Sequence, residues 1–241
     1  MSKAKRTPLR ITWFGHSAFR FDTPTGKVLL IDPWLDNPRA PAGARRPEKV
    51  DAILITHGHN DHVGNSVEIA AATGAKVVAI HEIALFLAKK GLSNLVGMNK
   101  SGTVALDGIE VTMVNAEHSS GIDSDEASRA GADPAGFVVK FENGMSVYHA
   151  GDTGLFGDMK LIASLYKPTV AVLPIGGYYT MGPREAARAC ELLNPKIIIG
   201  MHFGTFPILA GTPAQLKHFL PARLKKKVKI LEPGVSVELR V

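Results

Sequence analysis

The sequence predicts an α/β fold in which two mixed β-sheets pack face to face and helices cover their outer sides. Apolar runs rich in β-branched residues recur along the whole chain, and helical patterns lie between several of them. The 24 glycines and 15 prolines are spread along the chain, which is typical of many short elements joined by tight loops. Since strands and helices each bury one apolar side, a layered α/β arrangement would bury this pattern.

The elements alternate between strands and helices, with more strands in the first half. We expect strands at residues 10–14, 27–31, 52–56, 76–80, 109–114, 136–141, 145–149, 169–173, 196–200 and 228–231. We expect helices at residues 65–72, 82–90, 157–166, 183–193 and 213–219. The stretch 117–134 is polar and has no periodicity, which predicts a long functional loop.

Size and composition indicate one globular domain over residues 1–241. With 45% apolar and 21% charged residues, the chain has material for a sizeable core and is not of the disordered, collagen-like or coiled-coil class. No apolar run approaches the roughly 18 residues that span a bilayer, and no secretory signal is evident. The single cysteine, Cys190, cannot form an internal disulfide and lies at an apolar helical spacing. We therefore expect a cytoplasmic protein with no membrane partner.

The charge balance is basic, with 28 lysines and arginines against 22 acidic residues and a net charge of +6. Much of the excess lies near the two ends, at residues 3–10 and 223–229. We interpret these as solvated basic ends, so we do not expect nucleic acid as a partner.

The most informative segment follows the expected strand at 52–56. His57, His59, Asp61 and His62 offer four candidate ligands within six residues. Imidazole and carboxylate groups suit zinc, manganese or iron, and loops at strand ends can direct several such side chains at one point. Gly58 would allow a tight bend between the first two histidines.

Three more candidate ligands each follow an expected strand further along the chain. His118 follows 109–114, Asp152 follows 145–149 and His202 follows 196–200. Polar residues just beyond several strand ends are how a layered α/β fold assembles one site on one edge. The sequence therefore predicts a shared metal site.

This order of residues resembles the metallo-β-lactamase superfamily: His-x-His-x-Asp-His, a lone histidine, an aspartate in a Gly-Asp-Thr setting and a final histidine. Three further motifs are similar to the uncharacterised metal-dependent hydrolase family within it, whose relatives include ascorbate-phosphate lactonases. They are GHSAF at 15–19, PIGGYYTMGP at 174–183 and HFGTFP at 202–207. The resemblance covers essentially the whole chain and implies a four-layer αβ/βα sandwich.

The resemblance also implies a dinuclear metal centre. One metal would be held by His57, His59 and His118, the other by Asp61, His62 and His202, with Asp152 bridging the two. Asp32 matches an early aspartate that would fix the tautomer of a ligand imidazole. The expected cofactors are two divalent ions, with zinc favoured over manganese and iron.

Two such ions, roughly 3.5 to 4 Å apart, would supply hydroxide at neutral pH. Asp61 would orient this hydroxide, and His16 is the candidate side-chain proton donor, although the second metal could carry the leaving oxygen instead. Tyr178, Tyr179 and Thr180 follow a Gly-Gly pair and are candidate substrate contacts, with a simple packed aromatic pair as the alternative.

The predicted function is metal-dependent hydrolysis of an ester, lactone, amide or phosphodiester bond in a small molecule. The main alternative is a nuclease or phosphodiesterase that acts on nucleic acid. Such nucleases carry an extra clamp domain, for which this chain has no room. An iron-dependent oxidoreductase and a non-catalytic metal-binding protein are further alternatives. The residues leave open whether copies of the chain associate into a homo-oligomer.

Overall fold

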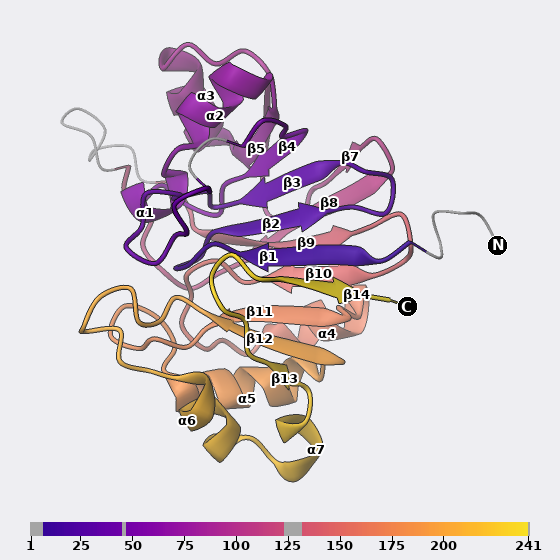
Figure 1. Cartoon of the computed structure of the whole chain (residues 1–241), viewed down its shortest axis with the longest axis vertical. Coiled ribbons are helices and arrows are strands. Elements are labelled where there is room, and N and C mark those ends of the chain that lie inside the picture. Colours follow the sequence, from indigo (N-terminus) through magenta and orange to yellow (C-terminus); the bar gives the residue numbers. More distant parts are fainter. Residues whose placement is uncertain (1–6, 45–46, 123–131, 241) are drawn as a thin grey trace.

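The strands form two sheets, as the sequence predicts, and each sheet has seven strands in the described part of the chain (Figure 1). A computed structural model describes residues 7–44, 47–122 and 132–240. The first sheet contains β1 (Leu9–Trp13), β2 (Phe19–Asp22), β3 (Val28–Ile31), β4 (Ala52–Leu54), β5 (Lys76–Ile80), β6 (Leu95–Met98) and β14 (Ser236–Leu239). The second contains β7 (Thr103–Leu106), β8 (Ile109–Asn115), β9 (Ala135–Lys140), β10 (Ser146–His149), β11 (Val170–Pro174), β12 (Ile197–Met201) and β13 (Val228–Lys229).

Both sheets have the same mixed arrangement. The first runs β14-β1-β2-β3-β4-β5-β6, antiparallel as far as β3 and parallel from β3 to β6. The second runs β7-β8-β9-β10-β11-β12-β13, antiparallel as far as β10 and parallel from β10 to β13. The predicted pair of mixed sheets in a metallo-β-lactamase fold is therefore confirmed.

The helices lie outside the two sheets (Figure 1). They are α1 (Asn60–Val63), α2 (Ser66–Thr73), α3 (His81–Lys89), α4 (Met159–Tyr166), α5 (Pro183–Leu193), α6 (Pro213–Phe219) and α7 (Ala222–Lys225). Helices α2 and α3 pack near β5 and β6, whereas α5 packs near β11. Pro183 and Pro213 stand in the first turn of their helices, where a missing N–H costs little.

The sequence analysis missed β2, β6, β7, β14 and the short helices α1 and α7. Strands β6, β7 and β14 lie at sheet edges and have partly exposed side chains, so their apolar signal is weak. Thr56 was expected in a strand, but β4 ends at Leu54 and the backbone N–H of Thr56 donates to Asp32 Oδ1 at 2.8 Å. The expected strand at 228–231 is likewise shorter, ending at Lys229.

The core lies between the sheets and contains a row of fully buried aromatic rings. The ring centres of Trp13 and Phe19 are 6.5 Å apart, and those of Phe19 and Phe21 are 6.2 Å apart. The Phe21 ring centre lies 5.7 Å from that of Phe141, which is beside the second sheet. Burying rings of this size supplies much of the hydrophobic stabilisation of a domain. Cys190 is buried in α5, and burial raises the pKa of its thiol to about 12, which confirms it as a core residue.

Two expectations concern segments that the structure describes only in part. Of the expected loop at 117–134, the described residues 117–122 and 132–134 contain no helix or strand, and 123–131 lie outside the described residues. Lys3, Lys5 and Arg6 of the basic N-terminal stretch also lie outside them. In the part of the chain that is described, no helix has the length and apolar character needed to cross a membrane.

The parallel strands end side by side, and this positions the candidate site. Ile31 pairs with Leu54, His149 pairs with Val172, and Pro174 pairs with Met201. The residues that follow these strands emerge at one edge of the molecule, where loops and α1 gather at the left of Figure 1. Ligands bind at such strand ends in layered α/β folds because side chains from several loops converge there.

Candidate metal centre

Sharp turns after the strands direct the predicted side chains towards one another. His16, Asp32 and His202 each follow a strand and have left-handed backbones, with φ of 49°, 48° and 54°. For a residue with a side chain this conformation costs about 1 to 2 kcal/mol, and such strain is concentrated at functional sites. The fold therefore holds three residues in an unfavourable backbone conformation at the edge where the strands end.

The first predicted ligand set is assembled in the structure. His57, His59 and His118 each offer one ring nitrogen, and these atoms lie within 4.8 Å of one another. The closest pair is His57 Nε2 and His59 Nδ1, at 2.9 Å. Ser119 Oγ lies 3.4 Å from the other nitrogen of His59, a contact that the sequence did not indicate.

The second predicted set is also assembled, and it includes one additional residue. Asp61 and His62, both carried by α1, meet His202 within the same 4.8 Å limit, and His16 joins them. The sequence analysis placed His16 at the site as a proton donor, whereas its Nε2 lies 3.0 Å from Asp61 Oδ2.

Asp152 lies between the two sets, where the sequence analysis expects a bridging ligand. Its Oδ2 is 2.9 Å from His202 Nε2 and 3.7 Å from His118 Nε2, and its Oδ1 is 3.4 Å from His62 Nε2. It also forms a third group with His57 and His62. All seven predicted metal ligands therefore meet at one place.

Unpaired polar atoms in this cluster fit a bound cation. His62 Nε2, Asp152 Oδ1 and His202 Nδ1 are buried and have no hydrogen-bond partner among the described residues. A buried polar atom without a partner costs about 1 to 3 kcal/mol. A divalent ion between the imidazole nitrogens and the carboxylate would remove this cost for His62 and Asp152, so the donor set fits a metal such as zinc.

Electrostatics favour positive charge at the centre of the cluster. Burial alone would lower the pKa of His62, but the carboxylates of Asp152 and Asp32 hold it well above the usual value. Burial would raise the pKa of Asp152, but His202 and His62 hold it well below the usual value. At His57 and His118, burial dominates and lowers the pKa, which favours the neutral imidazole that can bind a metal.

Asp32 fixes the orientation of two candidate ligands, as predicted for one of them. His62 Nδ1 donates to Asp32 Oδ2 at 2.8 Å, which leaves Nε2 to face Asp152. The Thr56 hydroxyl donates to the same oxygen at 2.7 Å and lies 3.0 Å from His57 Nδ1. The sequence analysis missed Thr56, although it directly precedes His57. One buried carboxylate thus orients His62 directly and His57 through Thr56.

His16 is buried, and protein groups occupy both of its ring nitrogens. Nδ1 lies 2.9 Å from Thr205 Oγ1, which the sequence analysis also missed, and Nε2 contacts Asp61. Burial lowers the pKa of His16 to about 4, so its ring is neutral at pH 7. Because its hydrogen bond also lowers the pKa of Asp61, His16 holds that carboxylate ionised and in place.

The neighbouring His149 and the three candidate substrate contacts lie outside the three groups. His149 is fully buried, with Nε2 donating to the Ser17 carbonyl and Nδ1 accepting from Gly151. Tyr178 and Tyr179 are 73% and 58% exposed and contact one another edge to face at 4.7 Å. The hydroxyl of Thr180 is buried without a described partner. Substrate binding by these last three residues stays a prediction.

Gly58 lies in a bend over residues 57–59, as expected, and close packing is a second reason for a glycine there. Its φ is not in the left-handed region, but a Cβ there would lie 2.9 Å from Ile122 and 3.0 Å from the Gly121 carbonyl. The neighbouring loop therefore approaches closely, and Gly58 donates its N–H to Ser120 Oγ at 3.0 Å.

Comparisons with known proteins agree with this geometry. A family model described as a beta-lactamase superfamily domain matches residues 10–202. The chain is 52% identical over 213 residues to a UPF0173 metal-dependent hydrolase of Koribacter versatilis, covering 88% of this chain and 91% of the relative. The chain belongs to the UPF0173 family of metal-dependent hydrolases. A Methanosarcina mazei member is 47% identical over 234 residues, covering 96% of this chain and 99% of that member.

A solved structure shows the same fold over the same length. Igni18, a metallo hydrolase from the archaeon Ignicoccus hospitalis, superposes with a TM-score of 0.87 at 38% identity. The match covers 98% of this chain and 100% of Igni18. The protein is therefore a metal-dependent hydrolase of the metallo-β-lactamase superfamily, and its histidine and aspartate clusters are groups that could bind the metal. The relation to ascorbate-phosphate lactonases stays a prediction.

Replacing Asp32 by asparagine should weaken metal binding by this hydrolase. In the protein one Asp32 oxygen accepts from the Thr56 backbone N–H, and the other accepts from His62 and the Thr56 hydroxyl. Asparagine has only one accepting oxygen, and its NH2 group would face a donor, so the orientation of His62 and His57 would relax. We expect zinc affinity to fall about 10- to 100-fold, measured by competition with a chromophoric chelator.

The matched control for this test is Asp158→Asn, because Asp158 is exposed and makes no side-chain cap at the start of α4. Its zinc affinity should equal that of the unchanged protein. Unchanged affinity in Asp32→Asn would contradict the orienting role.

His149→Gln should reduce the sensitivity of the metal-free protein to acid. Burial lowers the pKa of His149 to about 4, so between pH 6.5 and 4 the unfolded chain binds a proton that the folded chain does not. Stability is therefore lost as the pH falls through this window, by roughly 3 kcal/mol from this residue. Urea unfolding at pH 7 and pH 4 should show a smaller loss in the variant; an equal loss would refute the assignment.

Proposed function

We propose that this hydrolase cleaves an ester, lactone, amide or phosphodiester bond in a small molecule at a dinuclear metal centre. His57, His59 and His118 would hold one divalent ion, and Asp61, His62 and His202 would hold the other, with Asp152 shared. Two such ions supply hydroxide at neutral pH and polarise the oxygen of the bond that is cleaved. Zinc is the expected metal because imidazole and carboxylate ligands suit it, and manganese and iron are alternatives.

The observation that carries this proposal is the position of Asp152. One of its oxygens lies within 4 Å of His118 from the first set and of His202 from the second. Its other oxygen lies near His62, without a hydrogen-bond partner in the described chain. A purely structural metal site needs one closed ligand set, whereas two sets around a common carboxylate are typical of hydrolytic centres.

The exposure of the ligands supports a substrate path from one side. His57, His62, Asp152 and His202 are buried, whereas His59 and His118 are half-buried and the Asp61 side chain is 32% exposed. A catalytic site needs such an open side, because substrate must reach the metals. On that side Asp61 would orient the attacking group, and His16 keeps the Asp61 carboxylate ionised.

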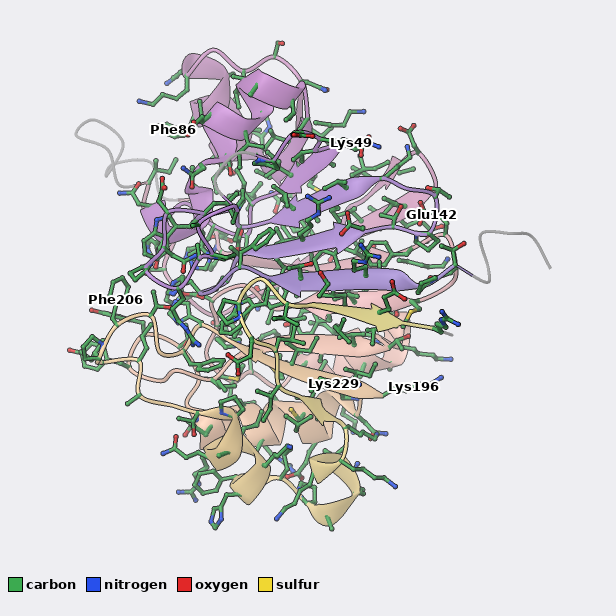
Figure 2. All side chains as sticks on the ribbon, in the orientation of Figure 1. Lys49, Phe86, Glu142, Lys196, Phe206 and Lys229 are labelled. Atoms are coloured by element: carbon green, nitrogen blue, oxygen red, sulfur yellow. The ribbon has the colours of Figure 1, made fainter. Side chains whose placement is uncertain are left out.

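Apolar rings border the same place and support a small-molecule substrate. The Trp34 ring contacts His16 edge to face at 5.2 Å, and Phe206 lies 6.1 Å from both rings. Phe206 is 40% exposed on the loop after β12, at the edge where the site lies (Figure 2). Aromatic walls with a few polar groups are typical of small-molecule sites.

The described basic residues near the C-terminus do not adjoin this site. Helix α7 and the residues after it contain Arg223, Lys225 and Lys226, and Figure 1 places this helix away from the loops at the strand ends. Nucleic acid would need cations that follow its backbone into the active site. We therefore favour a small molecule over the nuclease alternative.

Loss of Asp152 or His59 should remove both metal and activity. Asp152→Asn deprives both ligand sets of their shared charge, and His59→Ala removes one imidazole from the first set. We expect hydrolysis of a panel of chromogenic esters, lactones and phosphodiesters to fall at least about 100-fold, and the bound metal per chain, measured by mass spectrometry, to fall with it. Far-ultraviolet circular dichroism should be unchanged.

His218→Ala is the matched control, because His218 is exposed on α6 and belongs to none of the three groups. It should keep both metal content and turnover. Full activity in either ligand variant would overturn the proposed function.

A further inference from the structure

Arg39 is a half-buried cation, and the described part of the chain offers it no anionic partner. One guanidinium N–H, from Nη1, donates to the backbone carbonyl of Phe203 at 3.1 Å. Among the described residues no carboxylate lies within ion-pair distance of it. A cation that is partly removed from water is stabilised by a negative charge close by.

The surroundings of Arg39 hold its guanidinium in one place. The group lies 4.9 Å from the ring centre of Trp13 and 5.2 Å from that of Phe203. Gly15 and Gly204, both with left-handed φ, leave room for it, since a Cβ would lie 2.9 Å from Arg39 Cβ at Gly15 and 3.0 Å from Arg39 Nη1 at Gly204. The arginine is thus packed between rings and glycines instead of moving freely in solvent.

Arg39 lines an open pocket of about 630 Å³ beside the candidate metal centre. The other walls include Thr205, Phe206 and the hydroxyl-bearing Thr212. Thr205 contacts His16 Nδ1, and Phe206 faces the His16 ring. A single imidazole ring therefore separates the pocket wall from Asp61, one of the predicted ligands, so the pocket and the candidate metal centre are neighbours.

We propose that this pocket binds a carboxylate or phosphate group of the substrate, with Arg39 as its counter-ion. This proposal rests on the proposed function, because the acidic group and the bond that is cleaved would belong to the same substrate molecule. A planar guanidinium can donate two parallel N–H bonds to either group, and its Nη1–Phe203 bond fixes the plane. The hydrolase would then select acidic small molecules over neutral ones.

Calorimetric titration of the full chain with inorganic phosphate and, separately, with acetate tests the site. Metal is first removed with a chelator, so that metal-bound anion does not contribute, and circular dichroism verifies the fold. At pH 8 and low salt we expect the unchanged chain to bind one of the two anions at one site, and Arg39→Met to weaken this binding about 10- to 100-fold. The anion that the variant binds more weakly shows whether the acidic group of the substrate is a phosphate or a carboxylate.

Two further variants separate charge from packing. Arg39→Lys keeps the positive charge and should keep part of the affinity, while Arg39→Gln takes the place of the methionine variant if that variant does not fold. Arg184→Gln is the matched control, because Arg184 is exposed on α5 and outside the pocket, and should bind as the unchanged chain does. Equal affinity in Arg39→Met, or no binding by the unchanged chain, would overturn the proposal.

A kinetic comparison then links the pocket to the reaction. With metal bound, Arg39→Met should raise KM about 10-fold or more for an ester carrying a carboxylate or phosphate, and leave KM for its neutral analogue unchanged. An equal effect on both esters would contradict the assignment. The calorimetry needs no turnover, so failure of the anion site and failure of the proposed hydrolysis are separate results.

Discussion

The buried Asp152 carboxylate is the constraint on which the rest of the site depends. It is removed from water, and His202, His62 and His118 lie within 4 Å of it. An isolated buried charge would cost far more than the net stability of a domain, so the carboxylate needs positive charge close by. The imidazoles can provide it by taking up protons, as the raised pKa of His62 indicates, but a protonated ring cannot bind a metal. Divalent ions provide the positive charge while the rings stay neutral. The cluster is therefore arranged for cations.

The fold holds this cluster by fixing the outer groups first. Asp32 accepts from His62 and from Thr56, and Thr56 contacts His57, so one carboxylate sets the orientation of rings in both ligand sets. His16 does the same for Asp61. Because Asp32, Thr56 and His16 follow β3, β4 and β1, the packed first sheet positions the groups that orient the candidate ligands.

The sequence predicted the layered fold and the convergence of seven candidate ligands, because polar residues after apolar strands leave a clear pattern. It could not predict Thr56 or Thr205, since single hydroxyls next to histidines have no spacing that distinguishes them from ordinary turn residues. Edge strands such as β6 and β14 were missed because each has only four residues and buries little apolar surface, so its signal is weak. The bend at Gly58 was expected, but the close approach of the loop at Gly121 was not, because that loop is distant in the sequence.

Crystals of the protein grown with its native metal would test the central claim most directly, through an anomalous difference map at the absorption edge of that metal. The account predicts two peaks, each at roughly 2.0 to 2.2 Å from its imidazole nitrogens. His57, His59 and His118 would surround one peak, and His62 and His202 the other, with Asp152 bonded to both. A single peak, or two peaks without Asp152 between them, would contradict it.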